Sequence, residues 1–232
     1  MELIIISGQA RVGKTSLANH LAKESFELGL VPKLLSFADP LKAVAKEEGY
    51  DKESDPLGYR RYCQELGSRR RKEDKDYWVN SFEALLMDII RDERLELNKS
   101  NPYWERCVIV DDCRYENEVG LGLKHNATMV FLSSGDRELP EEKAEWRNHE
   151  SEALANAVEN GDEEKKGWFD YYFLNDGDDG DLRVKARAMA PIWCGLQASS
   201  LPISIEEDDR LDTGDVKEML NKYFGKQNGK IK

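Results

Sequence analysis

The residues from position 8 to position 16 are of the types that bind phosphate. Residues 8–15 read Gly-Gln-Ala-Arg-Val-Gly-Lys-Thr, which fits the spacing G-x-x-x-x-G-K-T, and only Ser7 separates them from the apolar residues 3–6. In this pattern glycines let backbone N–H groups converge on phosphate oxygens, the lysine reaches the outer phosphates, and the threonine hydroxyl binds Mg²⁺. The alternative is an ordinary glycine-rich turn. We predict a site for ATP and Mg²⁺ with these contacts: Gly8, Arg11, Val12, Gly13, Lys14, Thr15 and Ser16.

Acidic residues follow two other apolar runs, where predicted strands end. Asp39 comes shortly after residues 33–37, and Asp111 and Asp112 follow the run that begins at position 107. The carboxyl ends of parallel strands meet at one edge of a sheet, so we expect these carboxylates beside the phosphate site. Asp39 is a candidate catalytic base or substrate-binding acceptor toward a substrate hydroxyl, or only a helix cap. Either Asp111 or Asp112 is expected to orient Mg²⁺; we assign Asp111 as the metal ligand, with Thr15, and Asp112 as a catalytic residue.

Arginines and a histidine supply candidate contacts to phosphate. Arg114 follows the paired aspartates and could grip a phosphate through two parallel hydrogen bonds, or could pair with Glu116 or Glu118 on the surface. Arg147 lies in a charged stretch and is a candidate arginine finger over the transferred group. His149 beside it could bind substrate phosphate or be a solvent-exposed helical residue.

A second group of cations lies in residues 59–79, which are basic and aromatic within an acidic protein. Most of these arginines are expected to be solvated surface charges on helices. A kinase whose acceptor is itself an anion needs cations away from the phosphate loop, and this stretch could supply them. We therefore take Arg60 as a candidate acceptor-binding residue.

Composition limits the class of protein. The chain has 232 residues, enough for one sizeable domain, and a formal net charge of −12, which argues against a general nucleic-acid-binding surface but leaves room for a local basic cleft. The four cysteines lack metal-type spacing and predict reduced thiols in the cytoplasm. We find no signal segment and no apolar run of about 20 residues, so we expect a soluble protein without a membrane partner.

The elements that must position these residues alternate between strand and helix patterns. The predicted strands are short and continuously apolar, as in a parallel sheet covered on both faces: residues 3–7, 33–37, 107–111, 127–133 and 170–174. The predicted helices are residues 14–28, 39–48, two within 58–97 that are broken near 67–76, and 116–124. This alternation predicts an α/β doubly wound fold with a parallel sheet of about five strands and helices on both faces.

Three stretches depart from the alternation. Residues 135–167 are dense in charge and predict a lid-like insert, either a mobile flap or a helical hairpin. Residues 175–181 form an acidic, glycine-rich turn. Residues 191–232 follow the last core helix as a C-terminal extension. We therefore divide the chain into a core, residues 1–190, with acceptor-binding helices in 58–97, and the extension.

The order of these motifs resembles a known family. The phosphate loop, FADPLK, QELG with YWV, DDCR, HESE and NDG follow one another as in the bacteriophage-type deoxynucleoside monophosphate kinases, a branch of the P-loop nucleoside monophosphate kinases, over residues 1–190. The resemblance implies a P-loop kinase fold with a helical lid, and phosphoryl transfer from ATP to an acceptor in the cytoplasm, that of the host if the chain is viral. Beyond the phosphate loop, the matched positions are Asp39, Gln64, Gly67, Trp78, Asp112, Arg114, His149, Glu152, Asn175, Asp176 and Gly177.

The resemblance also implies roles for some matched residues and leaves the acceptor open. Gln64 and Trp78 belong to the acceptor-binding region, and Asn175 and Gly177 to a loop that approaches the donor base. The acceptor is a deoxynucleoside monophosphate or, alternatively, the hydroxyl of a hydroxymethylated pyrimidine in DNA, a DNA-modification activity with Asp39 as base. A regulatory NTP-binding module is a further alternative, and a homodimer is left open.

Overall fold

Five parallel strands form one sheet in the order β2-β3-β1-β4-β5. The structure is a computed structural model that describes residues 1–97, 106–135, 150–175 and 179–193. The strands confirm the five predicted ones and the α/β class: β1 Glu2–Ser7, β2 Val31–Leu35, β3 Arg106–Cys113, β4 Thr128–Ser133 and β5 Tyr171–Leu174. The prediction for β2 was two residues late at each end, because Ser36 and Phe37 belong to the turn that leads into the next helix.

Alternate side chains of the central strand β1 enter two separate cores. Leu3 and Ile5 pack into one hydrophobic cluster, and Ile4 and Ile6 pack into another, as the period of two in a strand requires. Ile4, Ile5 and Ile6 are all completely buried. The continuous apolar run therefore reflects a strand that is covered on both faces.

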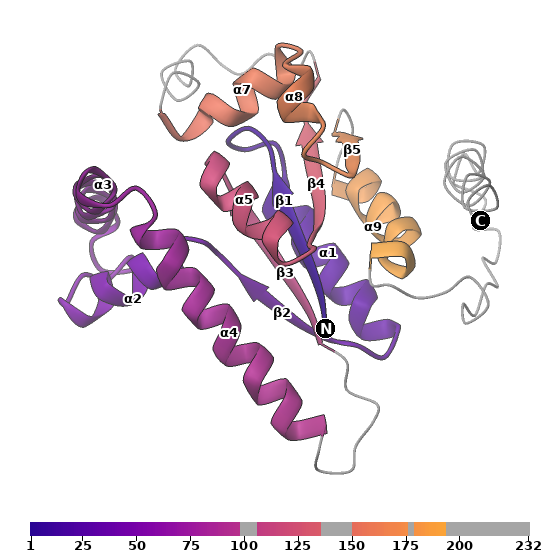
Figure 1. The fold of residues 1–232 in the computed structure, drawn as a ribbon, viewed down its shortest axis with the longest axis horizontal. Helices are drawn as coiled ribbons and strands as arrows, with labels where there is room; N and C mark the ends of the chain where they lie inside the picture. The colour runs from indigo at the N-terminus through magenta and orange to yellow at the C-terminus, as the bar shows by residue number, and fades with distance from the viewer. Residues whose placement is uncertain (98–105, 136–149, 176–178, 194–232) are drawn as a thin grey trace.

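Helices cover both faces of the sheet, which confirms the doubly wound arrangement (Figure 1). Two helices pack on the face of Ile4 and Ile6: α1 Lys14–Glu27 and α9 Asp179–Trp193. Three others contribute to the cluster on the face of Leu3 and Ile5: α4 Tyr77–Leu97, α5 Glu116–Lys124 and α7 Ala153–Glu159. The site described below lies where these layers meet the carboxyl edge of the sheet.

A third, smaller cluster joins α2 Asp39–Glu47 and α3 Pro56–Glu73 to α4. Its buried members are Leu41, Leu66 and Trp78. The predicted break between the two helices lies at residues 74–76, and Gly67 sits inside α3 rather than at its end. The carbonyl of Gly67 accepts a 3.2 Å hydrogen bond from Nε1 of Trp78, and a Cβ at this position would lie 3.2 Å from Nη1 of Arg71.

The described part of the predicted lid-like insert packs against the body of the protein. It consists of a 3₁₀ turn, η2 Glu150–Glu152, followed by α7 and α8 Glu163–Lys166. Leu154, Ala155 and Val158 of α7 are buried in the cluster on the face of Leu3 and Ile5. Residues 136–149 lie outside the described residues, as do 194–232 of the predicted extension. Within the described chain, we find no helix long and apolar enough to cross a membrane.

Candidate phosphate-binding site

The loop of residues 8–15 leaves β1 at the centre of the sheet. The chain continues from β1 to β2 and β3 on one side, and then crosses to β4 and β5 on the other. In open α/β sheets, ligands bind beyond the carboxyl ends of the strands at such a switch point. The sequence-predicted phosphate loop therefore occupies the position at which this topology favours a ligand.

The conformation of the loop depends on its glycines. Gly8 has φ 144° and Gly13 has φ 100°, both in the region that favours glycine, and Arg11 between them has φ 64°. A Cβ on Gly8 would lie 2.2 Å from the carbonyl oxygen of Leu132 in β4. The spacing of the motif thus allows a turn that passes close to the neighbouring strand before α1 begins at Lys14.

Lys14 is held inside this turn. Its side chain is buried, and Nζ donates 2.7 Å hydrogen bonds to the carbonyl oxygens of Gly8 and Gln9. Burial, and secondly the positive charge of Arg114, lower the pKa of Lys14 to about 8. The ammonium group is therefore fixed within the loop. Because burial destabilises its charge, a bound anion would stabilise it.

An open pocket of about 400 Å³ lies over the loop. Four of its side chains are basic and two are acidic, although the whole chain carries a net charge of −12. The pocket is lined by Arg11, Gly13, Lys14, Thr15, Ser16, Ser36, Lys42, Asp111, Asp112 and Arg114. Such a local excess of positive charge attracts anions, and the volume falls in the range of small-molecule sites.

Two predicted metal ligands meet at the pocket. The hydroxyl of Thr15 donates a 2.6 Å hydrogen bond to Oδ2 of Asp111, which lies near the end of β3. Both are hard oxygen ligands of the kind that Mg²⁺ prefers, and Mg²⁺ commonly takes only one or two carboxylates, with water and substrate phosphates completing its shell. The described residues contain no group of three or more His, Cys, Asp or Glu side chains that could hold a metal ion, so a cation here would depend on those other ligands.

Asp112 has a different set of contacts from Asp111. Its carboxylate accepts hydrogen bonds from the hydroxyl of Ser36 and from the backbone N–H groups of Phe37 and Ala38, at 2.5, 2.6 and 3.2 Å. Burial raises the pKa of Asp112 above its usual range, and these hydrogen bonds oppose that shift. Asp112 therefore fixes the turn between β2 and α2 while it lines the pocket.

Asp39 begins α2 but is not among the side chains that line the pocket. Its Oδ2 accepts a hydrogen bond from the backbone of Ser36, and its Oδ1 accepts one from Nζ of Lys42, both at 2.8 Å. Sequence reasoning missed Ser36 and Lys42, which do line the pocket. Lys42 lies three residues after Asp39 in the quoted FADPLK segment, so helical spacing was the signal that could have identified it.

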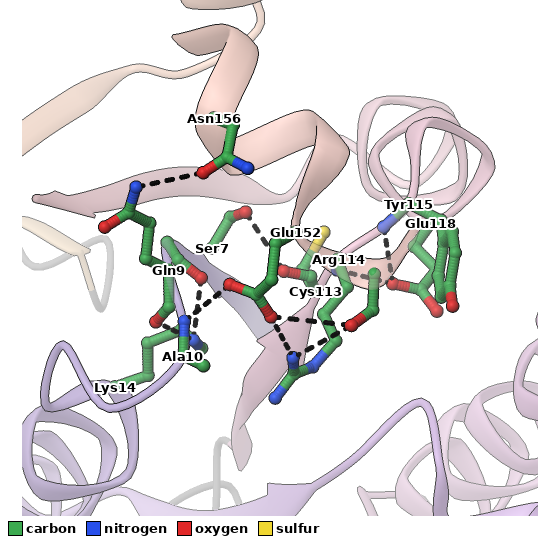
Figure 2. A network of polar contacts seen from close by, with 12 residues as sticks. Ser7, Gln9, Ala10, Lys14, Cys113, Arg114, Tyr115, Glu118, Glu152 and Asn156 are labelled. Atoms are coloured by element: carbon green, nitrogen blue, oxygen red, sulfur yellow. Dashed lines mark hydrogen bonds and ion pairs between the residues drawn. The ribbon is translucent and has the colours of Figure 1, made fainter. Parts of the chain in front are cut away.

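Arg114 lines the pocket and pairs with a residue far from it in the sequence. Its Nη1 lies 2.5 Å from Oε1 of Glu152 in η2 (Figure 2). As an alternative to a phosphate contact, the sequence predicted a surface ion pair of Arg114 with Glu116 or Glu118. Instead, the buried Glu118 accepts hydrogen bonds from the backbone N–H groups of Arg114 and Tyr115, at 2.6 and 3.0 Å.

The predicted acceptor-binding residues on α3 and α4 do not line this pocket. Arg60 and Gln64 are exposed on α3, and Trp78 is buried in the small cluster with Leu41 and Leu66. Arg71 of α3 lies near the site, because its guanidinium is 4.4 Å from the centre of the ring of Tyr115, the residue after Arg114.

Asn175 is not among the residues that line the pocket, but it contacts the same loop. Its Nδ2 donates a 2.7 Å hydrogen bond to the carbonyl oxygen of Val12, and its backbone N–H donates to Ser133 at 2.7 Å. Asn175 is buried and packs against Gly13, where a Cβ would come within 2.7 Å of Nδ2. Four other predicted or matched site residues lie outside the described residues: Arg147, His149, Asp176 and Gly177.

No protein-family model matches the chain, and no curated protein matches it either.

Proposed function

We propose that this chain is an ATP-dependent phosphotransferase that converts a deoxynucleoside monophosphate to the diphosphate. The proposal takes the fold to be that of a P-loop kinase. It is supported by the match of residues 8–15 to a triphosphate-binding motif, and by the position of that loop at the switch point of the sheet.

The observation that carries the proposal is the convergence of cations from separate elements in an acidic protein. Arg11 and Lys14 come from the loop, Lys42 comes from α2, and Arg114 follows β3. Phosphoryl transfer needs little covalent participation from the protein; it needs the two phosphate groups to be positioned and their charge to be stabilised. Cations that come from the loop, from α2 and from the end of β3 around one pocket suit a donor on the loop and an anionic acceptor beside it.

Thr15 and Asp111 would hold Mg²⁺ in this proposal. When bound, the ion would neutralise charge on the donor phosphates. The roles left to the chain are that Lys14 contacts the outer phosphates, Arg114 and Lys42 bind the acceptor phosphate, and Asp112 keeps the turn before α2 in place. Asn175 supports the loop through its hydrogen bond to the carbonyl oxygen of Val12.

An anionic acceptor is better supported than a hydroxyl acceptor in DNA. A hydroxyl acceptor requires a carboxylate base, and both oxygens of Asp39 are already engaged, by Ser36 and Lys42. Two of the arginines that could form a DNA track also have internal contacts: Arg70 pairs with Glu73, and Arg71 stacks on Tyr115. A monophosphate carries its own negative charge and needs mainly cationic contacts.

The proposal is tested by supplying γ-labelled ATP and Mg²⁺ with each of the four deoxynucleoside monophosphates, and in parallel with hydroxymethyluracil-containing DNA. We expect label in a deoxynucleoside diphosphate. Label in the DNA would support the hydroxyl-acceptor alternative instead, and the absence of label from every acceptor would favour a regulatory NTP-binding module.

A further inference from the structure

One buried carboxylate connects the two sides of the candidate site. Glu152 is 3% exposed, and its two oxygens have different partners. Oε2 accepts a 2.7 Å hydrogen bond from the backbone N–H of Ala10, inside the loop, and Oε1 lies 2.5 Å from Nη1 of Arg114 (Figure 2). The same side chain therefore contacts the loop that would hold the donor and the arginine that would bind the acceptor.

The segment that carries Glu152 is fixed to both the loop and the core. Asn156, one turn later on α7, accepts a 3.0 Å hydrogen bond from Nε2 of Gln9, the residue before Ala10. Leu154 and Ala155 between them are buried against the sheet. Two consecutive loop residues are thus bound by two side chains of one rigidly packed segment.

The negative charge of Glu152 repels an anionic ligand. A carboxylate beside the pocket lowers its positive potential and should by itself weaken the binding of a polyphosphate. Burial also removes the solvation of the carboxylate, and here an ion pair and a hydrogen bond compensate for that loss. A residue in such a place has to contribute through geometry, because its charge alone opposes the ligand.

We propose that Glu152 is a positioning residue, which holds the Arg114 guanidinium and the Ala10 segment of the loop in one fixed relation, so that the loop keeps the conformation that binds a polyphosphate and Arg114 faces the outer end of that polyphosphate. The proposal rests on the proposed function for its effect on turnover. Its effect on binding does not, since it concerns how the chain holds any polyphosphate. Glu152 acts through Arg114 and the loop, and it need not touch the substrate.

The test compares Glu152→Gln with Glu150→Gln, which removes the same charge from an exposed position in the same 3₁₀ turn. The dissociation constant of Mg²⁺–ATP is measured for both variants, together with turnover and melting temperature. We expect Glu152→Gln to weaken ATP binding by about fivefold to tenfold, the lower end of the usual range of coupling energies, and to lower turnover further. Glu150→Gln should change neither.

The direction of the binding change decides between geometry and charge. If Glu152 only reduces the positive potential, its removal tightens ATP binding, and that result, or unchanged binding, would overturn the proposal. A second readout is the amide proton shift of Ala10, which should move upfield when a charged acceptor is replaced by a neutral one. An unmoved Ala10 resonance would show that the contact does not exist in solution.

A second variant and the binding measurements distinguish a positioning role of Glu152 from a folding defect and from a failure of the proposed function. If Glu152→Gln does not fold, Glu152→Asp keeps the charge but shortens the side chain, and it too should weaken ATP binding; unaltered binding would contradict the positioning role. If the wild-type protein transfers no phosphoryl group to any acceptor, the proposed function fails, while ATP binding and the Ala10 shift still decide whether Glu152 positions the loop.

Discussion

Thr15 and Asp111 lie 96 positions apart in the chain, and the hydroxyl of Thr15 donates a 2.6 Å hydrogen bond to the Asp111 carboxylate. The next residue, Asp112, contacts Ser36, Phe37 and Ala38 instead. The two neighbouring carboxylates therefore have separate tasks: one completes a pair of oxygen ligands at the loop, and the other holds the turn before α2.

This division predicts different results for the two asparagine variants. Asp111→Asn removes charge from the proposed cation site, so the Mg²⁺ concentration that gives half-maximal transfer should rise about tenfold, with stability little changed. Asp112→Asn should instead lower the melting temperature, because an amide NH₂ would face backbone N–H donors. Mg²⁺ titrations and thermal scans of both variants check this. The assignment is wrong if Asp112→Asn alone alters the Mg²⁺ requirement.

Lys14→Ala should abolish most phosphoryl transfer while the fold is retained. Removing one preorganised charge-stabilising group commonly lowers turnover by about 10²–10³-fold. The control is Lys23→Ala, on an exposed position of the same helix. Turnover and far-UV circular dichroism are measured together; wild-type turnover in the Lys14 variant would refute the site.

Arg114→Ala should impair use of the acceptor far more than it impairs binding of ATP. Arg114 lines the pocket but follows β3 and is not part of the loop that would hold the donor, and its side chain is about one-third exposed. We expect KM for the monophosphate to rise about tenfold or more, against a smaller change in the dissociation constant of ATP. Arg91→Ala, which removes an exposed ion pair on α4, is the control. Equal losses in both quantities would mean that the role of Arg114 is misassigned.

Trp78→Phe should affect stability rather than the acceptor. The variant loses the hydrogen bond from Nε1 to Gly67 and some buried volume in the cluster with Leu41 and Leu66. The free energy of unfolding should fall by about 1–3 kcal/mol, which urea denaturation measures, with KM for the acceptor unchanged. A tenfold rise in KM for the acceptor at unaltered stability would instead support the predicted role of Trp78 in substrate binding.

Glu118 should make stability depend on pH near neutrality. Burial, and secondly the charge of Asp112, raise the pKa of Glu118 to about 8 from an ordinary 4.5. The folded protein therefore binds a proton that the unfolded chain releases above pH 4.5, so this contribution is complete at low pH and is lost as pH rises toward 8. Unfolding free energies at pH 5 to 8 should fall more steeply for the wild type than for Glu118→Gln. Parallel pH profiles would contradict the raised pKa.

The sequence could predict the sheet and the loop because both depend on local pattern. Continuous apolar runs indicated five covered strands, and the spacing of Gly8, Gly13 and Lys14 fixed the turn between β1 and α1. Element boundaries were less certain: Gly67 suggested a helix end, but α3 continues to Glu73, and Gly67 lies buried within it with its carbonyl bonded to Trp78.

The partners of the site residues could not be predicted in the same way. Ala10 and Glu152 are 142 positions apart, and only the packing of α7 on the sheet brings them together. Arg114 was expected to pair, if at all, with a near neighbour, yet its partner is also Glu152. Motif order indicated that Glu152 belongs with the site, but its contacts depend on three-dimensional topology.

The most direct test of phosphoryl transfer is a ³¹P NMR time course of the wild-type protein with ATP, Mg²⁺ and an equimolar deoxynucleoside monophosphate. We predict that the γ-phosphate resonance of ATP decays while the β-phosphate resonance of the deoxynucleoside diphosphate grows in equal amount, and that neither changes with Lys14→Ala. Release of inorganic phosphate alone, or an unchanged spectrum with all four monophosphates, would contradict the account.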